Sequence, residues 1–492
     1  MKYIIAHDFG TSALKSAVYS TDGELLNCTS VDYPSFRTAD GIVEQDPENW
    51  WQAFCSANRT LTDGIDKNEI ACVSFDGVTA ALVCCGHDGK ALHRAIMWQD
   101  GRSAAEAKEI LSMLTTPELK NGRNFMGPGR TCVQLYWVCR HHPEIIEKTE
   151  KVCLNNANFV VSRLIGKYVT DYEIGSSGAL MYAERGKGWD MDFIRLLGIP
   201  ERILPEAHWM EEIVGTVTSE MSEEVSLAAG TPVMLGGDDG RMVTLGTGVV
   251  NEGDSSITCG TSGGVTVLGA NVGLPGTNAV GSTMEWLRRT LCSEEEAEAA
   301  ASGRSVFDLM AETASRSSAG ANGVLFIPYL GNERGIRRNT LTRGCFAGMS
   351  LGTIREDMVR AGIEGIILNL YGFVRRFRDA GCEVSSMTAN GGLTKNAYIR
   401  QMMADIIGSE IVLVQNASYS GPTGCAMLAS MAVGETSSLS EAAERFVRTE
   451  SVTYPDRELH EFYKGIFKVW DALYGSQLEI YEKLAELRTS MQ

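Results

Sequence analysis

Short apolar stretches alternate with turn-forming residues at the start of the chain. The apolar run Tyr3 to Ala6 leads into a polar, glycine-containing segment, and the alternating run Leu14 to Tyr19 ends before the pair Asp22-Gly23. This pattern predicts two antiparallel strands joined by a tight turn, with a third strand close behind. Further strands are expected at residues 71–75, 80–85, 231–235, 255–259, 265–268 and 387–389.

Helical spacing dominates other parts of the chain, from about 103 to 228 and again after about 303. In the segment after Gly391-Gly392, apolar residues recur at i, i+3, i+4 and i+7, which predicts an amphipathic helix. The last fifty residues show a similar pattern, with Phe462, Ile466, Val469 and Leu473 expected on the buried face of a helix that packs on the second half of the chain.

A Gly-Thr-Ser turn between two strand patterns occurs twice, at residues 10–12 and 260–262. The repetition indicates two lobes of related construction. A chain of 492 residues is also too long for one ordinary core. We therefore expect an N-terminal lobe at 1–248 and a C-terminal lobe at 249–492.

Composition narrows the class of protein. Lys and Arg number 44 against 62 Asp and Glu, giving a net charge of −18, and the basic residues form no run. This disfavours nucleic acids and anionic membranes as partners. The apolar start of the chain is too short for a signal peptide, and no apolar stretch approaches membrane length, so we expect a cytoplasmic protein. The 13 cysteines form no CxxC pair, which predicts reduced thiols rather than a zinc site.

The two Gly-Thr-Ser turns are candidates for binding phosphate. Asp8 ends the first strand, Thr11 and Ser12 offer hydroxyls and backbone N–H groups, and Lys15 follows within reach of an anion. The alternative for one such turn is a plain surface hairpin. Two facing turns, the second at 260–263, would clamp phosphates from both sides, with a nucleotide in a cleft between the lobes.

Asp238 and Asp239 follow a buried strand and two glycines, directly before an expected helix near Arg241. A carboxylate there can accept the proton of a substrate hydroxyl during phosphoryl transfer. The alternative is that an aspartate caps the helix. Both hold if one carboxylate caps and the other reacts.

Glycines also open two later helices. Gly391-Gly392 precede Asn396, and the segment Ser420 to Gly424 begins another helix; these glycines would let the backbone approach adenine and ribose, or they serve helix capping. The chain contains neither GxxxxGK[ST] nor GxGxxG after a first strand. A nicotinamide-dependent dehydrogenase is therefore disfavoured.

Taken in order, these segments resemble the FGGY family of carbohydrate kinases, most closely its xylulokinase members, over nearly the whole chain. The resemblance implies an α/β fold of two ribonuclease-H-like (actin-like ATPase) lobes with a cleft between them. The segments that carry it are residues 8–15, 43–51, 95–102, 236–240, 260–263, 326–330, 343–344, 391–405 and 421–426.

The resemblance also implies a set of ligands and residue roles. ATP and Mg²⁺ would be required, with Asp8 holding the metal through water. The N-terminal lobe would bind sugar and supply the base, and the C-terminal lobe would bind the nucleotide. Phosphates would face Thr11, Ser12, Lys15, Gly260 and Thr261, and the adenosine would face Gly391, Gly392 and Asn396.

The resemblance favours Asp239 as the catalytic base, because an ungapped count back from Gly260 places the family's aspartate there. It implies a sugar pocket at Asp76, Thr79, Trp98, Asp100 and Asp239. The xylulokinase Met-His pair of that pocket is replaced by Thr79 and Ala80. A ketopentose such as D-xylulose is expected, and another polyol, ketose or gluconate-like sugar acid stays open.

One further alternative is a protein without catalytic activity. A non-catalytic actin-like sensor of sugar or nucleotide would have lost the acidic base or a phosphate turn, and both are present here. The oligomeric state, such as a homodimer, is not fixed by the sequence. We therefore expect an ATP-dependent kinase acting on a small sugar in carbohydrate catabolism.

Overall fold

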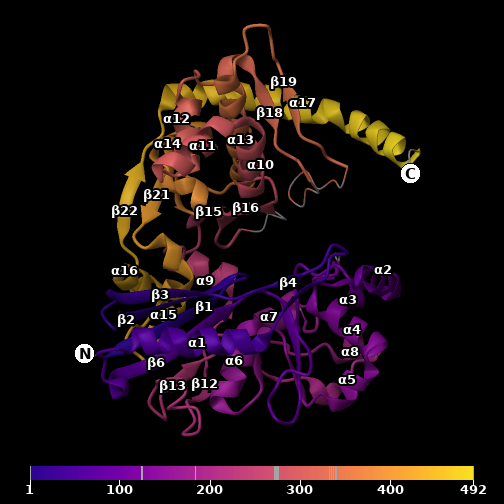
Figure 1. Cartoon of the computed structure of the whole chain (residues 1–492), viewed down its shortest axis with the longest axis vertical. Helices are drawn as coiled ribbons and strands as arrows, with labels where there is room; N and C mark the ends of the chain where they lie inside the picture. The colour runs from indigo at the N-terminus through magenta and orange to yellow at the C-terminus, as the bar shows by residue number, and fades with distance from the viewer. Residues whose placement is uncertain are drawn as a thin grey trace. The chain divides into compact units, whose positions relative to one another are not determined.

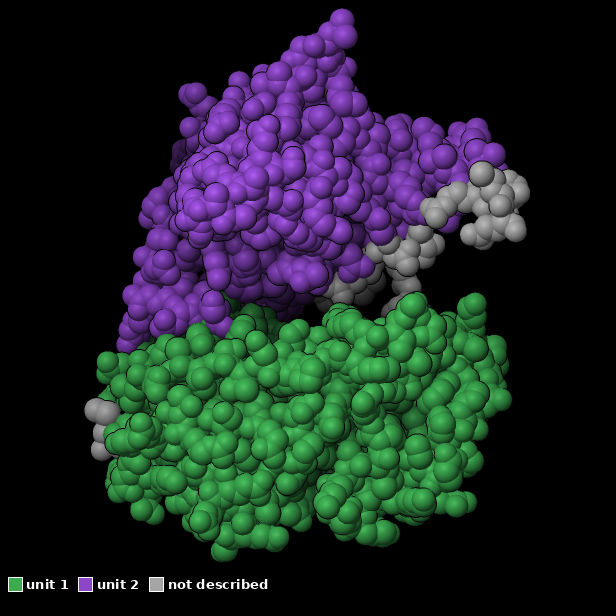
Figure 2. Space-filling view, viewed as in Figure 1, with its two compact units in different colours: residues 1–248, 419–447 green, residues 249–418, 448–492 purple. Residues whose placement is uncertain are grey.

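The computed structural model describes residues 2–123, 126–182, 184, 186–270, 276–331, 333, 335, 337, 339 and 341–490. The chain divides into two compact units, traced in Figure 1 and coloured in Figure 2. Unit 1 comprises Met1–Gly248 and Tyr419–Val447, and unit 2 comprises Val249–Ser418 and Arg448–Gln492. The segment 419–447, which the sequence led us to expect in the C-terminal lobe, packs in unit 1.

The main sheet of unit 1 has seven strands in the order β12-β13-β6-β1-β2-β3, with β14 pairing β6. The β1–β2 and β2–β3 pairs are antiparallel, as the N-terminal pattern predicts, and β6 runs parallel to β1. The bounds are β1 (Tyr3–Phe9), β2 (Ala13–Ser20), β3 (Leu25–Asp32), β6 (Ile70–Gly77), β12 (Ile213–Thr216), β13 (Pro232–Met234) and β14 (Gly237–Asp238).

A second sheet of unit 1 has the order β4-β5-β8-β7-β9, and β10 pairs β11. The segment 103–228, expected to be rich in helix, contains α2 to α8 but also four short strands, β9 to β12. The strands of the second sheet are β4 (Phe36–Arg37), β5 (Val43–Gln45), β7 (Ala81–Cys85), β8 (Ala95–Met97) and β9 (Lys151–Cys153). The separate pair is β10 (Val169–Asp171) and β11 (Glu206–His208).

Helices cover these sheets. The first is α1 (Pro47–Leu61), which starts where Asp46 accepts a hydrogen bond from the Glu48 backbone N–H and buries Trp50, Trp51 and Phe54. The others in unit 1 are α2 (Ala104–Met113), α3 (Pro117–Lys120), α4 (Thr131–His141), α5 (Pro143–Lys148), α6 (Asn156–Ile165), α7 (Tyr172–Ser177), α8 (Met191–Leu196), α9 (Asp239–Gly246), α15 (Ser420–Ala432), α16 (Leu439–Phe446), and the 3₁₀ turns η1 (Lys67–Glu69) and η2 (Glu201–Ile203).

Unit 2 is built on a six-stranded sheet in the order β17-β16-β15-β20-β21-β22. The strands of this sheet are β15 (Ser255–Cys259), β16 (Gly263–Val267), β17 (Gly276–Thr277), β20 (Ser386–Asn390), β21 (Glu410–Val414) and β22 (Thr449–Thr453). A separate pair is formed by β18 (Leu325–Ile327) and β19 (Cys345–Ala347). Its helices are α10 (Gly281–Leu291), α11 (Ser293–Ser302), α12 (Val306–Ser315), α13 (Arg355–Asp379), α14 (Ala397–Ile407) and α17 (Arg457–Ser490), with the 3₁₀ turns η3 (Ala321–Gly323) and η4 (Gly392–Lys395); η5 (Ala417–Tyr419) precedes α15.

The two main sheets have the same topology. In unit 1, β3, β2 and β1 are successively antiparallel, β1, β6 and β13 are parallel, and β12 is antiparallel. In unit 2, β17, β16 and β15, then β20 and β21, then β22 follow the same sequence of pairings. The two Gly-Thr-Ser turns predict an internal repeat. The two main sheets show this repeat, because their six strands in order have the same antiparallel and parallel pairings.

The packed face of the long helix α17 matches the expected one in part, because Ile466 and Leu473 pack against the core of unit 2 as predicted. Phe462 and Val469 are 46% and 58% exposed, whereas Tyr463, Phe467 and Trp470 are buried in the core of unit 2. The aromatic residues one position further along supply the larger apolar area, so they decide the packed face. No helix in the described part of the chain has the length and apolar character that crossing a membrane requires.

We predict that Trp470→Ala lowers the free energy of unfolding of unit 2 by about 3–5 kcal/mol, because a fully buried indole is removed. Its Nε1–H also donates to the Phe326 carbonyl at 2.7 Å. The neighbouring Val469→Ala is the control, with an expected change within about 0.5 kcal/mol. Denaturant unfolding measures both, and equal losses would contradict the assigned face.

Candidate functional site

Three neighbouring strands of unit 1 deliver carboxylates to the same end of the sheet. Asp8 on β1 is the register partner of Asp76 on β6, and Asp76 is in turn the partner of Gly237 on β14. Asp238 and Asp239 follow Gly237 directly. The carboxyl ends of parallel strands are where open α/β sheets bind ligands.

Asp8 and Asp76 share a hydrogen bond between their side chains. Asp8 is 8% exposed, whereas Asp76 is fully buried and also accepts a hydrogen bond from the Cys425 thiol at 3.1 Å. Burial raises the pKa of both carboxyls, and the charges of Asp8 and Asp239 raise the pKa of Asp76 further. Both carboxyls therefore favour the protonated form more than an exposed carboxyl does, Asp76 most of all.

Asp238 is the carboxylate that caps α9. Its Oδ1 accepts the Arg241 backbone N–H at 3.2 Å, and its Oδ2 accepts the Thr79 hydroxyl at 2.5 Å. One oxygen is therefore engaged by the segment that follows β6 and the other by the start of α9. This is the capping role that sequence reasoning left open for one of the two aspartates.

Asp239, by contrast, makes one hydrogen bond, from the backbone N–H of Gly240 to its Oδ1 at 2.8 Å. Burial, the charge of Asp238 and the charge of Asp8 raise the pKa of Asp239 well above its usual range. A carboxylate with a raised pKa and an available oxygen is a competent proton acceptor.

The turn after β1 is fixed by contacts to its carbonyl groups. Asn156 Nδ2 donates to the Phe9 carbonyl at 2.9 Å, and Gln45 Nε2 donates to the Thr11 carbonyl at 2.7 Å. The Tyr33 hydroxyl donates to the Gly10 carbonyl, and the Tyr33 backbone N–H donates to the Ser12 carbonyl at 3.1 Å. Four successive carbonyls are thus held in place, which fixes the orientation of the turn.

Lys15 and Trp98 lie beside this turn. Lys15 is the register partner of Asp8 across the β1–β2 pair, and its charge opposes the rise in the Asp8 pKa. Trp98 is 45% exposed, and its Nε1–H donates to the Thr11 hydroxyl at 3.2 Å. The structure therefore brings together the predicted residues Asp8, Thr11, Lys15 and Trp98. Asp239 lies close enough to Asp8 for the charge of Asp8 to raise its pKa.

Two residues predicted to touch sugar are occupied elsewhere. Asp76 is enclosed behind Asp8, as described above. Asp100 is buried, and its oxygens accept the Val43 backbone N–H at 2.7 Å and the Arg102 guanidinium at 2.8 Å. Asp100 joins the strand β5 to the segment after β8, so its position is structural.

The helix α15 backs the carboxylates, which the sequence did not predict. A Cβ on Gly421 would lie 2.6 Å from Asp8 Oδ2, and a Cβ on Gly424 would lie 2.1 Å from the Met242 carbonyl. The glycines of the 420–424 segment, which we expected to approach adenine, instead allow α15 to pack against β1 and α9. A side chain at Gly424 would clash with the backbone of α9, and one at Gly421 would displace the Asp8 carboxylate.

In unit 2, the turn 260–262 is packed against two other segments. The backbone N–H of Gly281, at the start of α10, donates to the Gly260 carbonyl at 3.0 Å. Gly391 has φ of 102°, and a Cβ there would lie 2.3 Å from the Cys259 carbonyl. The predicted phosphate turn at Gly260 and Thr261 therefore lies next to the predicted nucleotide segment at Gly391 and Gly392.

Asn396 caps α14, accepting hydrogen bonds from the backbone N–H groups of Tyr398 and Ile399 at 3.0 and 3.1 Å. Its side-chain amide also donates to Asp308 at 2.7 Å. These contacts fit the capping alternative of the sequence analysis and leave its predicted contact with adenosine a prediction.

Several residues that build the site were missed from the sequence. Gln45, Tyr33 and Asn156 act through the backbone of the turn, and Cys425 contacts Asp76 from a segment about 350 positions away. Gln45 and Cys425 carried a signal, because each lies in one of the segments that carry the family resemblance. Within the described residues no three His, Cys, Asp or Glu side chains are grouped as metal ligands.

Known proteins resemble this chain over nearly its full length. The xylulose kinase of Bacillus subtilis (strain 168) is 29% identical over 99% of this chain and 100% of that protein, and the gluconokinase of the same organism is 28% identical over 90% of each. The crystal structure of gluconate kinase from Lactobacillus acidophilus has a TM-score of 0.86 at 24% identity, covering 98% of this chain and 99% of that one.

The likeness to the solved structure confirms the predicted α/β class with two ribonuclease-H-like units. Residues 3–246 match the N-terminal domain, and residues 242–433 the C-terminal domain, of the FGGY family of carbohydrate kinases. The two matches together span most of the chain and agree with the family predicted from its motifs. The chain belongs to the FGGY family of carbohydrate kinases.

Proposed function

We propose that this carbohydrate kinase transfers the γ-phosphoryl group of ATP to a small neutral sugar, with a ketopentose such as D-xylulose as the preferred acceptor, and that Asp239 is the base. The observation that carries the assignment of the base is the contrast between two adjacent carboxylates. Asp238 uses both oxygens to hold Thr79 and the α9 backbone, while Asp239 accepts only the Gly240 N–H.

Asp239 would accept the proton of the sugar hydroxyl as that oxygen attacks the phosphorus. The raised pKa of Asp239 supports this role, because a carboxylate of higher proton affinity is the stronger base once it is ionised. His7, one residue before Asp8, is an unsuitable base. Burial lowers its pKa to about 3, and its ring packs between Phe54 and Phe75 in the core.

The phosphates would be bound by the turn after β1, through Thr11, Ser12 and Lys15, and by the turn at Gly260 and Thr261. We assign the first set to the sugar-binding unit 1 and the second, with Gly391, Gly392 and Asn396, to nucleotide binding by unit 2. The fixed carbonyls of the first turn support this, since a pre-oriented backbone can direct N–H groups at an anion without reorganisation.

Magnesium fits the acidic end of the β1–β6 pair. In kinases Mg²⁺ is typically held by one or two carboxylates together with substrate phosphates, so a cage of protein ligands is not required. Asp8, the less buried carboxyl of the pair, would hold the ion, which would supply neutralisation of phosphate charge. Asp76 would keep Asp8 in place from behind.

The choice of D-xylulose rests on the named relatives and on the family resemblance. A gluconate-like sugar acid is the second candidate, because a gluconokinase is nearly as similar as the xylulose kinase and the Asp239-Gly240 pair resembles gluconate-type kinases. A coupled ATP-consumption assay across ketopentoses, polyols and sugar acids tests the choice. Turnover with D-xylulose above all other acceptors is expected, and preference for an acid would replace it.

We predict that Asp239→Asn lowers kcat by about 10²–10⁴-fold, because the amide cannot take the proton. Binding of ATP and sugar, measured by calorimetry, should stay close to that of the unchanged protein. The matched control is Asp238→Asn, the same substitution one residue away. Near-normal kcat in Asp239→Asn, or a dead Asp238→Asn, would reverse the assignment of the base.

Asp238→Asn should also change the pH profile. Asn caps helices as well as Asp, so α9 stays intact. Removal of the charge at 238 lowers the raised pKa of Asp239, so more Asp239 is ionised at acidic pH and the acid limb of kcat moves to lower pH. A limb that stays in place, or moves to higher pH, would show that Asp238 does not act on the base.

Gly421→Ala should reduce kcat by about tenfold or more, because the new Cβ would displace Asp8, and misplaced catalytic groups lose activity steeply. The Mg²⁺ concentration for half-maximal activity should rise as well. Gly475→Ala in α17 is the control, since a Cβ there meets no atom within 4 Å. Equal activities of the two variants would contradict the role given to Gly421.

A further inference from the structure

The turn after β1 presents two successive backbone N–H groups that the described part of the chain does not use. The Gly10 N–H donates to the Ala13 carbonyl at 3.1 Å, but the N–H groups of Thr11 and Ser12 have no partner among the described residues. Thr11 is partly buried and Ser12 is exposed. Adjacent N–H groups at an accessible turn form a nest for anions, provided that both point outward.

The direction of each N–H follows from the carbonyl group of the same peptide unit. In a planar trans peptide the C=O of one residue and the N–H of the next point in opposite directions. The Tyr33 hydroxyl donates to the Gly10 carbonyl, and Gln45 Nε2 donates to the Thr11 carbonyl at 2.7 Å. Tyr33 and Gln45 are 6% and 2% exposed, so both carbonyls point toward buried side chains. The N–H groups of Thr11 and Ser12 therefore point away from the core.

Gln45 can hold the Thr11 carbonyl only through its NH₂ group, and Trp50 determines which way that group faces. The Trp50 indole N–H donates to Gln45 Oε1 at 2.8 Å. An indole N–H is only a donor, so it selects the amide oxygen and leaves the NH₂ group for the Thr11 carbonyl and the Ser35 hydroxyl, each at 2.7 Å. Trp50 is itself fully buried in α1, which keeps the amide in one orientation.

We infer that Gln45, oriented by Trp50, is a positioning residue for phosphate binding: it keeps the Thr11–Ser12 peptide turned so that the Ser12 N–H faces the phosphates of ATP. This rests on the proposed function, because it requires the turn after β1 to be a phosphate site. If that peptide rotates, the Thr11 carbonyl replaces the N–H, and an acceptor then opposes the anion. Gln45 acts through the backbone and needs no contact with the ligand.

Trp50→Phe tests this inference most sharply, because it changes a core residue that is linked to the turn through Gln45. Phenylalanine keeps most of the apolar ring but removes the indole N–H, so the amide loses the donor that fixes its direction. We expect the affinity for ATP to fall about fivefold. The affinity for adenosine should stay unchanged, since adenosine has no phosphate. Calorimetry with ATP and a competition assay with adenosine measure the two constants.

The matched control is Trp51→Phe, the same substitution one residue away. Trp51 is equally buried in α1, but its indole N–H donates to Glu224 at 2.6 Å. The affinities of Trp51→Phe for ATP and for adenosine should both stay close to those of the unchanged protein. Thermal unfolding of both variants measures the loss of packing that they share.

Gln45→Met removes the amide and keeps the length of the side chain. The affinity for ATP should fall about tenfold or more, because a hydrogen bond from a backbone N–H to a charged phosphate is lost. KM for ATP should rise with it, while KM for the sugar stays close to that of the unchanged protein. Should Gln45→Met not fold, Trp50→Phe still decides the inference.

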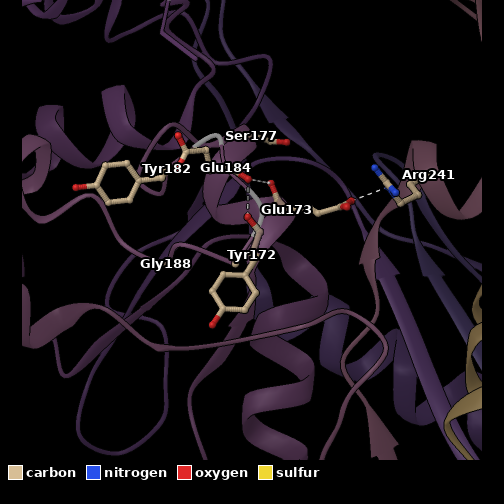
Figure 3. Close-up of a pocket in the computed structure, with 9 residues that line it drawn as sticks. Tyr172, Glu173, Ser177, Tyr182, Glu184, Gly188 and Arg241 are labelled. Atoms are coloured by element: carbon tan, nitrogen blue, oxygen red, sulfur yellow. Dashed lines mark hydrogen bonds and ion pairs between the residues drawn. The ribbon is translucent and has the colours of Figure 1, made fainter. Parts of the chain in front are cut away.

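A cavity of about 340 Å³ at the start of α9 is the competing place for a phosphate in unit 1, because Arg241 lies in its wall (Figure 3). None of the described residues that line it belongs to the turn after β1, and Arg241 Nε lies 2.6 Å from Glu173 Oε2. Arg241→Gln should therefore leave the affinity for ATP unchanged. A loss in Arg241→Gln that exceeds the loss in Gln45→Met would move the phosphate to the cavity and overturn the inference.

The outcomes separate the inference from the proposed function. If the protein binds ATP but phosphorylates no sugar, the proposed function fails, and the ratio of the ATP and adenosine affinities in each variant still decides the inference. If phosphorylation occurs and Trp50→Phe and Gln45→Met keep the ratio of Trp51→Phe, the inference fails alone. Equal losses of ATP and adenosine affinity in Trp50→Phe would show a general loss of structure and overturn the inference as well.

Discussion

The hydrogen bond between Asp8 and Asp76 is the contact on which the site depends. Two carboxyls lie on adjacent parallel strands, one of them fully buried, and burial raises the pKa of both. The sheet fixes their spacing, Cys425 contacts Asp76 from α15, and Gly421 lets α15 approach Asp8 without a clash. Asp8 directly precedes the turn that we propose binds phosphate, and its charge also raises the pKa of Asp239.

The internal repeat shows what distinguishes the two units. In unit 2 the strands that correspond to β1 and β6 are β15 and β20, and the register partners at the equivalent positions are Thr258 and Asn390. These side chains are neutral, so unit 2 has the topology without the acidic pair. The same scaffold therefore supports a charged reaction centre in unit 1 and, as we propose, a neutral turn for phosphates in unit 2.

The sequence predicted the family, the strands around both Gly-Thr-Ser turns and the pairing of Asp8 with the turn that follows it, because these are local patterns. From the sequence, the choice between Asp238 and Asp239 as the base depended on the spacing to Gly260. In the structure the two differ, because Asp238 caps α9. The sequence did not predict the position of α15 in unit 1, since that depends on packing between residues far apart in the chain. On α17 the prediction was right for Ile466 and Leu473 and wrong for Val469, because periodicity does not weigh Trp470 against Val469.

The most direct test of the account is a crystal structure of the protein with D-xylulose, magnesium and a non-hydrolysable ATP analogue. The account predicts that one sugar hydroxyl lies within hydrogen-bond distance of the Asp239 carboxylate and that the magnesium lies at Asp8. A hydroxyl on Asp238 in place of Asp239, or a magnesium held away from Asp8, would contradict it.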